Sequence, residues 1–123
     1  MGLRAKITSW RNGYEITKSI GNFLDDIAES DIDEAFSYIA INLGNVIAAS
    51  SLADAFMEQI ENFCLHPRAG TPVENEFLKR DDVRYFLVKN YIVYYVVDDV
   101  SRKIVVLRFV YGKRNQDNVL SGL

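Results

Sequence analysis

The sequence predicts an α+β fold in which a helical hairpin packs on one face of a mostly antiparallel sheet, made of an N-terminal strand and a C-terminal three-stranded meander. The last third of the chain holds three runs rich in β-branched and aromatic residues, Val83–Val88, Tyr91–Val97 and Ile104–Val110. Short polar breaks separate them, which is typical of a three-stranded antiparallel meander. The middle of the chain instead repeats apolar residues at helical spacing on both sides of one short break.

The N-terminal thirty residues admit two interpretations. Arg4–Trp10 and Tyr14–Thr17 flank an Asn-Gly pair, which is a strong signal for a β-hairpin. Alternatively, only Tyr14–Thr17 is a strand that adds to the sheet of the meander, and residues 1–13 are an extension. Phe23, Leu24 and Ile27 could then begin a helix that either merges with the next one or precedes it.

The first helix of the hairpin is predicted over residues 31–43. Its apolar side chains share one helical face, at Ile32, Phe36, Ile39 and Leu43. Ser30 is the expected N-cap, with Asp33 three residues on in the manner of a capping box. Gly44 suits a left-handed C-terminal position, and Asn45 can cap the following helix at once.

The second helix is predicted from Val46 to about Cys64, where Pro67 and Gly70 follow and stop it. The connection is so short that the two helices must fold back on each other. We expect a buried stripe on one side and acidic residues in solvent on the other. The stripe is Ala49, Leu52, Ala53, Phe56, Ile60 and Phe63, and the solvent-facing acids are Asp54, Glu58 and Glu61.

The central strand of the meander is apolar or aromatic on both faces. Alternate residues of a strand point to opposite faces. Tyr91, Val93, Tyr95 and Val97 therefore share one face, and Ile92, Tyr94 and Val96 share the other. One face meets the helices, and the other needs a cover, since monomers rarely leave a large apolar patch bare. The cover could be a partner protein, the N-terminal segment or the C-terminal tail.

The bulk composition is that of one globular domain spanning residues 1–123, with 49% hydrophobic and 25% charged residues. The N-terminus shows no apolar signal segment, and no apolar run approaches the roughly 20 residues that span a bilayer. We therefore expect no membrane partner. A single cysteine cannot form an internal disulfide, so we also expect a reduced, cytoplasmic protein.

The net charge of −3 hides an asymmetry between the two parts of the chain. Residues 1–78 carry five Lys/Arg and twelve Asp/Glu, a net −7, whereas residues 79–123 carry nine and five, a net +4. A basic sheet half is either an ordinary solvated surface or a surface that meets an anionic partner.

No familiar catalytic signature occurs in the sequence. One histidine and one cysteine exclude a Cys/His metal cluster, and there is no phosphate loop or nucleophile elbow. His66 suits the C-terminal end of a helix, and Cys64 suits a small buried apolar position. The residues that could carry chemistry are basic ones on or just beyond the strands, because guanidinium groups bind phosphates. They are Arg84, Arg108, Lys113 and Arg114.

The stretch from Asn42 to Leu120 resembles the RelE/ParE superfamily of toxins from bacterial type II toxin–antitoxin modules, of the plasmid stabilisation type. The order and spacing of several short pieces carry the resemblance. They are Tyr38-Ile39-Ala40, Asn42-Leu43-Gly44-Asn45, His66 to Val73, Val83-Arg84, Asn90 to Asp98, and Leu107 to Asn115. Tyr14-Glu15-Ile16-Thr17 looks like the first strand of the family, whereas residues 1–12 and about 22–33 depart from it.

The resemblance implies one of three activities. RelE-like members cut mRNA on the ribosome without a metal, and for that branch Arg114 and Arg84 would be catalytic. Ile92 and Leu120 stand where that branch has an arginine and a tyrosine, and the acidic pI of about 5.1 suits ribosomal RNA poorly. ParE-like members inhibit DNA gyrase without catalytic residues. A third reading is a degenerate module that only binds antitoxin.

We therefore expect a ParE-like growth-inhibiting toxin that acts on DNA gyrase and is neutralised by a cognate antitoxin, with no cofactor and no metal. The alternative partner is the ribosome with its mRNA, and a homodimer is a further option. The residues expected to contact a target or partner are Arg108, Lys113, Arg114, Tyr91, Tyr94 and Tyr111.

Overall fold

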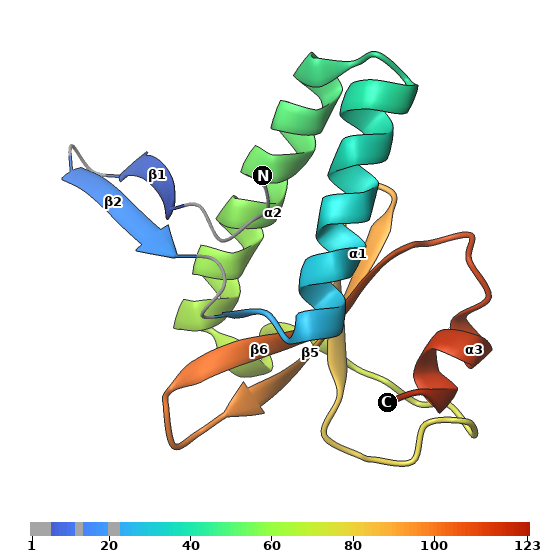
Figure 1. The fold of residues 1–123 in the computed structure, drawn as a ribbon. Helices are drawn as coiled ribbons and strands as arrows, with labels where there is room; N and C mark the ends of the chain where they lie inside the picture. Colours follow the sequence, from blue (N-terminus) through green and yellow to red (C-terminus); the bar gives the residue numbers. More distant parts are fainter. Residues whose placement is uncertain (1–5, 12–13, 20–22) are drawn as a thin grey trace.

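The protein is an α+β fold built on a four-stranded antiparallel sheet with the order β3-β4-β5-β6 (Figure 1). The computed structural model describes residues 6–11, 14–19 and 23–123. The strands of the sheet are β3 (Thr71–Pro72), β4 (Arg84–Val88), β5 (Tyr91–Asp98) and β6 (Lys103–Tyr111). The helices are α1 (Asp26–Ser37), α2 (Val46–Leu65) and α3 (Gln116–Ser121). The predicted fold class is confirmed.

The meander follows the prediction closely. Strand β5 pairs with β4 from Tyr91↔Val88 to Tyr95↔Arg84, and with β6 from Tyr91↔Tyr111 to Asp98↔Lys103. A bulge interrupts the second ladder, because Tyr94 pairs with Arg108 while the next residue, Tyr95, pairs with Val106. The extra residue on β6 re-aims the side chains that follow it.

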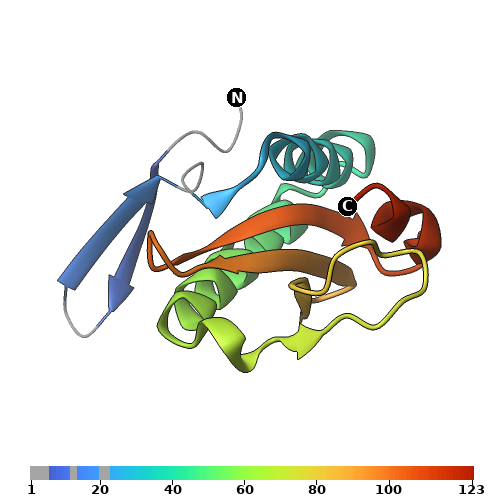
Figure 2. The same ribbon diagram turned by 90° about the horizontal axis from the view of Figure 1, so that it is seen from below.

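The N-terminal strands form a sheet of their own. β1 (Lys6–Arg11) pairs antiparallel with β2 (Tyr14–Ser19), as the hairpin interpretation predicts. The predicted turn at Asn12-Gly13 lies outside the described residues, as do residues 1–5. The prediction that the N-terminal strand belongs to the sheet of the meander is therefore wrong. Tyr14–Thr17 pairs with β1, and the fourth strand of the main sheet is β3. Both views show the β1–β2 pair apart from the four-stranded sheet (Figure 2).

Helix α1 begins earlier than predicted, so the alternative of a merged helix is the observed one. Asp25 caps it, since its carboxylate accepts from the backbone N–H of Asp26 at 3.0 Å. The predicted N-cap, Ser30, lies inside the helix because the chain is already fixed at Asp25, whose N–H donates to the Val106 carbonyl of β6 at 2.9 Å. After Ser37 the helix continues as one π-helical turn, Tyr38–Asn42.

The turn between the helices is as predicted. Gly44 has a left-handed φ of +60°, and the Asn45 side chain accepts from the N–H of Ala48 at 2.9 Å, which caps α2. Most of the predicted stripe of α2 is buried. Glu61, expected in solvent, is also buried, as is Met57 one turn before it, so the buried face of α2 is wider than the sequence pattern suggests.

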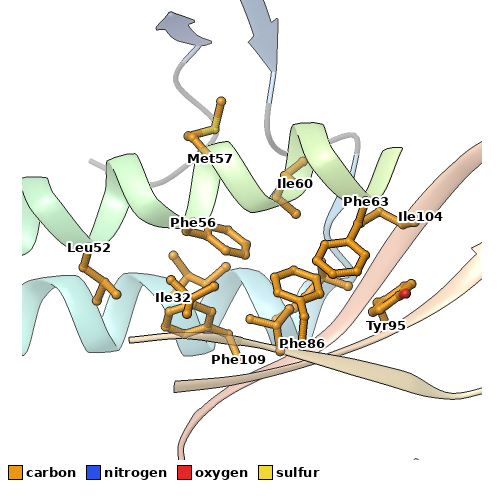
Figure 3. Close-up of a cluster of buried hydrophobic side chains, with 14 residues drawn as sticks. Ile32, Leu52, Phe56, Met57, Ile60, Phe63, Phe86, Tyr95, Ile104 and Phe109 are labelled. Atoms are coloured by element: carbon orange, nitrogen blue, oxygen red, sulfur yellow. The ribbon is translucent and has the colours of Figure 1, made fainter. Parts of the chain in front are cut away.

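Aromatic side chains from α2 fill the space between the hairpin and the sheet (Figure 3). The ring of Phe63 stacks on that of Phe86 with centroids 4.4 Å apart, and Phe56 meets Phe109 edge-on at 5.1 Å. Such pairs each add about 0.5–1.5 kcal/mol beyond the burial of their area. The core therefore fixes the hairpin on β4 and β6.

The opposite face of the sheet is covered by the C-terminal part of the chain. Val119 and Leu120 of α3 pack against Tyr94, Leu107 and Val110, with Val73 and Leu78 of the β3–β4 connection beside them. Of the three covers that the sequence left open, the C-terminal tail is the observed one.

The two edges of the sheet differ. At the β6 edge, Leu24 forms a parallel bridge with Val106, and the start of α1 lies alongside. At the other edge, β3 pairs only with Arg84 and Tyr85, so in the described chain β4 runs past it through Phe86–Val88. The side chain of Leu87 there is 57% exposed.

Candidate functional site

A basic turn follows β6 and is held by several hydrogen bonds. The N–H of Gly112 donates to the Asn90 carbonyl at 2.8 Å, and the N–H of Arg114 donates to the Tyr111 carbonyl at 3.0 Å. Asn115 ends the turn and caps α3 through its side chain. We call residues 112–115 the basic turn. Within the described part of the chain, Lys113 and Arg114 are exposed and form no ion pair.

The side chain of Gln116 holds this turn in place. Its side-chain amide donates to the carbonyls of Tyr111, Gly112 and Arg114 at 3.2, 3.4 and 2.9 Å, and its carbonyl oxygen accepts from the Tyr94 hydroxyl at 2.8 Å. Tyr94 is buried against α3. The position of the basic turn therefore depends on a residue that the sequence analysis did not single out.

Three tyrosines lie beside the turn. The ring of Tyr91 stacks on Phe109 with centroids 4.8 Å apart and meets Tyr111 edge-on at 5.7 Å. Burial, and then the neighbouring Tyr111 and Tyr38, raise the pKa of Tyr91 above its usual value. The phenol is therefore neutral near pH 7, and it is suited to packing and hydrogen bonding rather than to accepting a proton.

These side chains line a groove between the helical hairpin and the end of the sheet. Its volume is about 680 Å³. The helical wall carries Glu34, Tyr38, Ile39 and Leu43, and the wall at the sheet carries Lys89, Tyr91, Tyr111 and Arg114. An acidic side chain thus lies on one wall and basic side chains lie on the other, with aromatic and aliphatic surface between them. We call this the tyrosine groove.

Arg108 is placed away from solvent by a carboxylate of α1. Its Nε and Nη2 donate to Asp31 at 2.7 and 3.2 Å, and the same carboxylate accepts from the N–H of Phe109 at 3.0 Å. The two side chains are only 15% and 10% exposed. Arg108 and the buried Tyr94 were both expected to contact a partner, and in this structure both bind other parts of the chain.

Arg84 is likewise used within the fold. Its guanidinium donates to the carbonyls of Arg68 and Gly70 at 3.0 and 2.8 Å. Arg84 pairs with Tyr95 of β5, whereas Arg114 follows Tyr111, which pairs with Tyr91. Four residues of strand separate these positions, a distance of roughly 13 Å along β5. The structure does not bring the two arginines together.

The residues gathered at the groove only partly match those the sequence singled out. Tyr91, Tyr111 and Arg114 line it, and Lys113 lies on the same turn. Glu34 comes from α1 and Tyr38 from the π-helical turn. Tyr38 belongs to one of the pieces that carry the family resemblance but was not expected at the site, and no local motif marks Glu34. No three His, Cys, Asp or Glu side chains lie together as a metal site in the described part of the chain. Nor does any described helix have the length and apolar character to cross a membrane.

One comparison with known proteins found a family match. A family model described as ParE toxin of type II toxin–antitoxin system, parDE, matches residues 23–116. The match therefore begins just before Leu24, which forms a bridge with Val106 of β6, and it ends at Gln116, directly after the basic turn. No curated protein matches the chain significantly.

Proposed function

The chain belongs to the ParE toxin family of type II toxin–antitoxin systems, and from this premise we propose that it inhibits growth by binding DNA gyrase in the cytoplasm. It does so as a binding protein, without cleaving a substrate. A cognate antitoxin neutralises it by occupying the tyrosine groove.

We favour a binding protein over a nuclease because Arg84 and Arg114 lie far apart. Cleaving RNA through its 2′-hydroxyl requires a base and cations gathered within hydrogen-bond reach of one reacting group. Here the Arg84 guanidinium donates to two backbone carbonyls, and Arg114 lies near the other end of β5, beside Tyr91, whose raised pKa keeps its phenol neutral near pH 7. The basic turn is suited to an anionic or polar protein surface.

The groove supports the proposal for the antitoxin. Glu34 on one wall and Lys89 and Arg114 on the other would select a segment that carries both charges, and the tyrosines between them supply apolar area. Aromatic and arginine side chains are the residues that most often dominate the binding energy of protein interfaces.

A supercoiling assay with purified gyrase tests the proposal. The wild-type protein should inhibit supercoiling at micromolar concentration, and the double variant Lys113→Ala/Arg114→Ala should lose most of this inhibition. Removing an arginine anchor costs at least about 1–2 kcal/mol of binding energy, roughly a five- to thirty-fold loss. The matched control is Lys79→Ala/Arg102→Ala, which removes the same charge from two exposed positions far from the groove.

Three results would overturn the proposal. The first is the absence of any effect of the wild-type protein on gyrase. The second is cleavage of mRNA in a translation extract that disappears in Arg114→Ala, which would assign the ribosome-dependent nuclease activity instead. The third is growth that is unaffected by expression without antitoxin, which would indicate a module that only binds antitoxin.

A further inference from the structure

The tip of the helical hairpin carries no charge. Residues 38–53 contain no Asp, Glu, Lys or Arg, although a quarter of the whole chain is charged, so a stretch of this length would ordinarily carry about four. The stretch covers the π-helical turn, the Gly44 connection and the first two turns of α2. Such a composition is unusual for exposed helices.

The tip is also strongly apolar on its surface. Five large hydrophobic side chains are more than half exposed there, with Ile41 at 76% and Ile47 at 83%. They are Tyr38, Ile41, Leu43, Val46 and Ile47. Tyr38 and Leu43 also line the tyrosine groove, so we call the other three, Ile41, Val46 and Ile47, the tip surface. Figure 1 shows the hairpin rising past the end of the sheet, so that the tip projects from the body of the protein. Contiguous exposed apolar surface of this kind marks an interaction site.

The tip is held in one conformation before any partner arrives. The N–H groups of Leu43, Gly44 and Asn45 donate to the carbonyls of Tyr38, Ile41 and Ile39 at 3.0, 3.3 and 3.1 Å. Asn45 caps the next helix as well. A preformed surface pays little conformational entropy on binding.

We propose that the tip surface binds the tip surface of a second copy of the chain, giving a symmetric dimer. In a two-fold contact each patch faces its own copy, so any charge near the axis would oppose a like charge. A neutral apolar patch avoids that cost. The depletion of charge is also characteristic of the centre of homodimer interfaces.

The contrast with the tyrosine groove supports a second copy over a different protein. A foreign partner is usually selected and steered by complementary charges. The groove offers such charges at Glu34, Lys89 and Arg114, whereas the tip surface offers none. Two projecting hairpins can lie side by side as four helices, the arrangement in which exposed apolar positions on helical pairs are commonly buried.

Sedimentation of the purified protein tests the proposal. Wild-type protein should sediment as a dimer at micromolar concentration, and Ile41→Glu/Ile47→Glu should sediment as a monomer, with the dissociation constant raised at least tenfold. Both side chains are exposed, so the far-ultraviolet circular dichroism should be unchanged. The melting temperature should fall only at concentrations at which the wild-type protein is dimeric, because association stabilises the folded state. The control is Val100→Glu, which places a charge on a 96% exposed apolar residue in the β5–β6 turn; it should stay dimeric.

A charge-reversal experiment separates loss of contact from loss of folding. The Ile41→Lys/Ile47→Lys variant alone should also be monomeric, but an equimolar mixture with the glutamate variant should recover the dimer, because opposite charges then meet. A monomeric wild-type protein, or a glutamate variant that still dimerises, would overturn the proposal. Neither result depends on gyrase, so failure here leaves the proposed function standing.

Discussion

Replacing Asp31 with alanine should be among the most destabilising single changes in this protein. The Asp31 carboxylate receives three hydrogen bonds, two from the guanidinium of Arg108 and one from the backbone N–H of Phe109. It thereby joins α1 to β6 across 77 residues of sequence. Asp31→Ala leaves a largely buried cation and a strand N–H without their acceptor.

The size of the effect follows from burial. With only 15% and 10% of the two side chains exposed, little water can replace the lost partner. Removing one member of a buried pair costs about 3–5 kcal/mol, which is a large share of the roughly 5–15 kcal/mol by which a domain is stable. In urea, with a slope near 1–3 kcal/mol per molar, the midpoint should fall by about 2 M.

Urea unfolding followed by far-ultraviolet circular dichroism measures this directly. The control is Asp99→Ala, which breaks a bidentate pair with Arg68 on the surface, where both side chains are mostly exposed. That pair is screened by water, so its loss should leave the midpoint almost unchanged. The double variant Asp31→Leu/Arg108→Met removes both charges and should recover much of the lost stability.

A shift for Asp31→Ala no larger than that for Asp99→Ala would refute this reasoning. So would a double variant as unstable as the single one, since the cost would then come from packing and not from an uncompensated charge.

Three further outcomes follow from particular contacts. Gly70→Ala should lower the free energy of unfolding by about 1–3 kcal/mol, because a Cβ there would overlap both the hydroxyl and the ring of Tyr95; urea unfolding measures it, and Gly122→Ala, where a Cβ meets only ordinary contacts, should change it little. Gln116→Glu should loosen the basic turn by about 1–2 kcal/mol, because a carboxylate cannot donate to its three carbonyls. Amide hydrogen exchange at residues 112–115 should then accelerate, whereas the exposed, charge-matched Asn118→Asp should not change it. Burial raises the pKa of the three tyrosines of β5, so their contribution to stability is complete below the unfolded pKa of about 10 and is lost as pH rises through the folded values. The melting temperature should fall above that pH together with the rise of tyrosinate absorbance; a flat profile would contradict the assignment.

Local patterns account for the parts of the fold that the sequence predicted well. The meander and α2 are long, strongly periodic and bounded by clear breaks. The turn between the helices was predictable because glycine favours a left-handed φ and asparagine is a good N-cap. The start of α1 was misplaced because Ser30 and Asp25 are comparable caps, and only the contact of Asp25 with Val106 decides between them.

The remaining differences depend on contacts between distant residues. β3 is two residues long and includes a proline, so no strand pattern announces it. Arg108 looks like a free cation until Asp31, far away in sequence, is placed beside it. Tyr94 likewise looks free in the sequence, but its hydroxyl donates to the side chain of Gln116, 22 residues away. The exposure of Lys113 and Arg114 was predictable because they follow the last strand of the meander.

The unequal edges of the sheet limit how the protein can aggregate. A fibril that grows by strand addition needs two free edges on every molecule, one to receive a neighbour and one to offer to the next. At the β6 edge, the Leu24 bridge and the Asp31 contact already occupy Val106 and Phe109. A second chain could align with β4 at Leu87, but that pairing would consume the open edge of both molecules and stop at two. Strand addition at the four-stranded sheet, as the described residues form it, should therefore end at a pair of molecules.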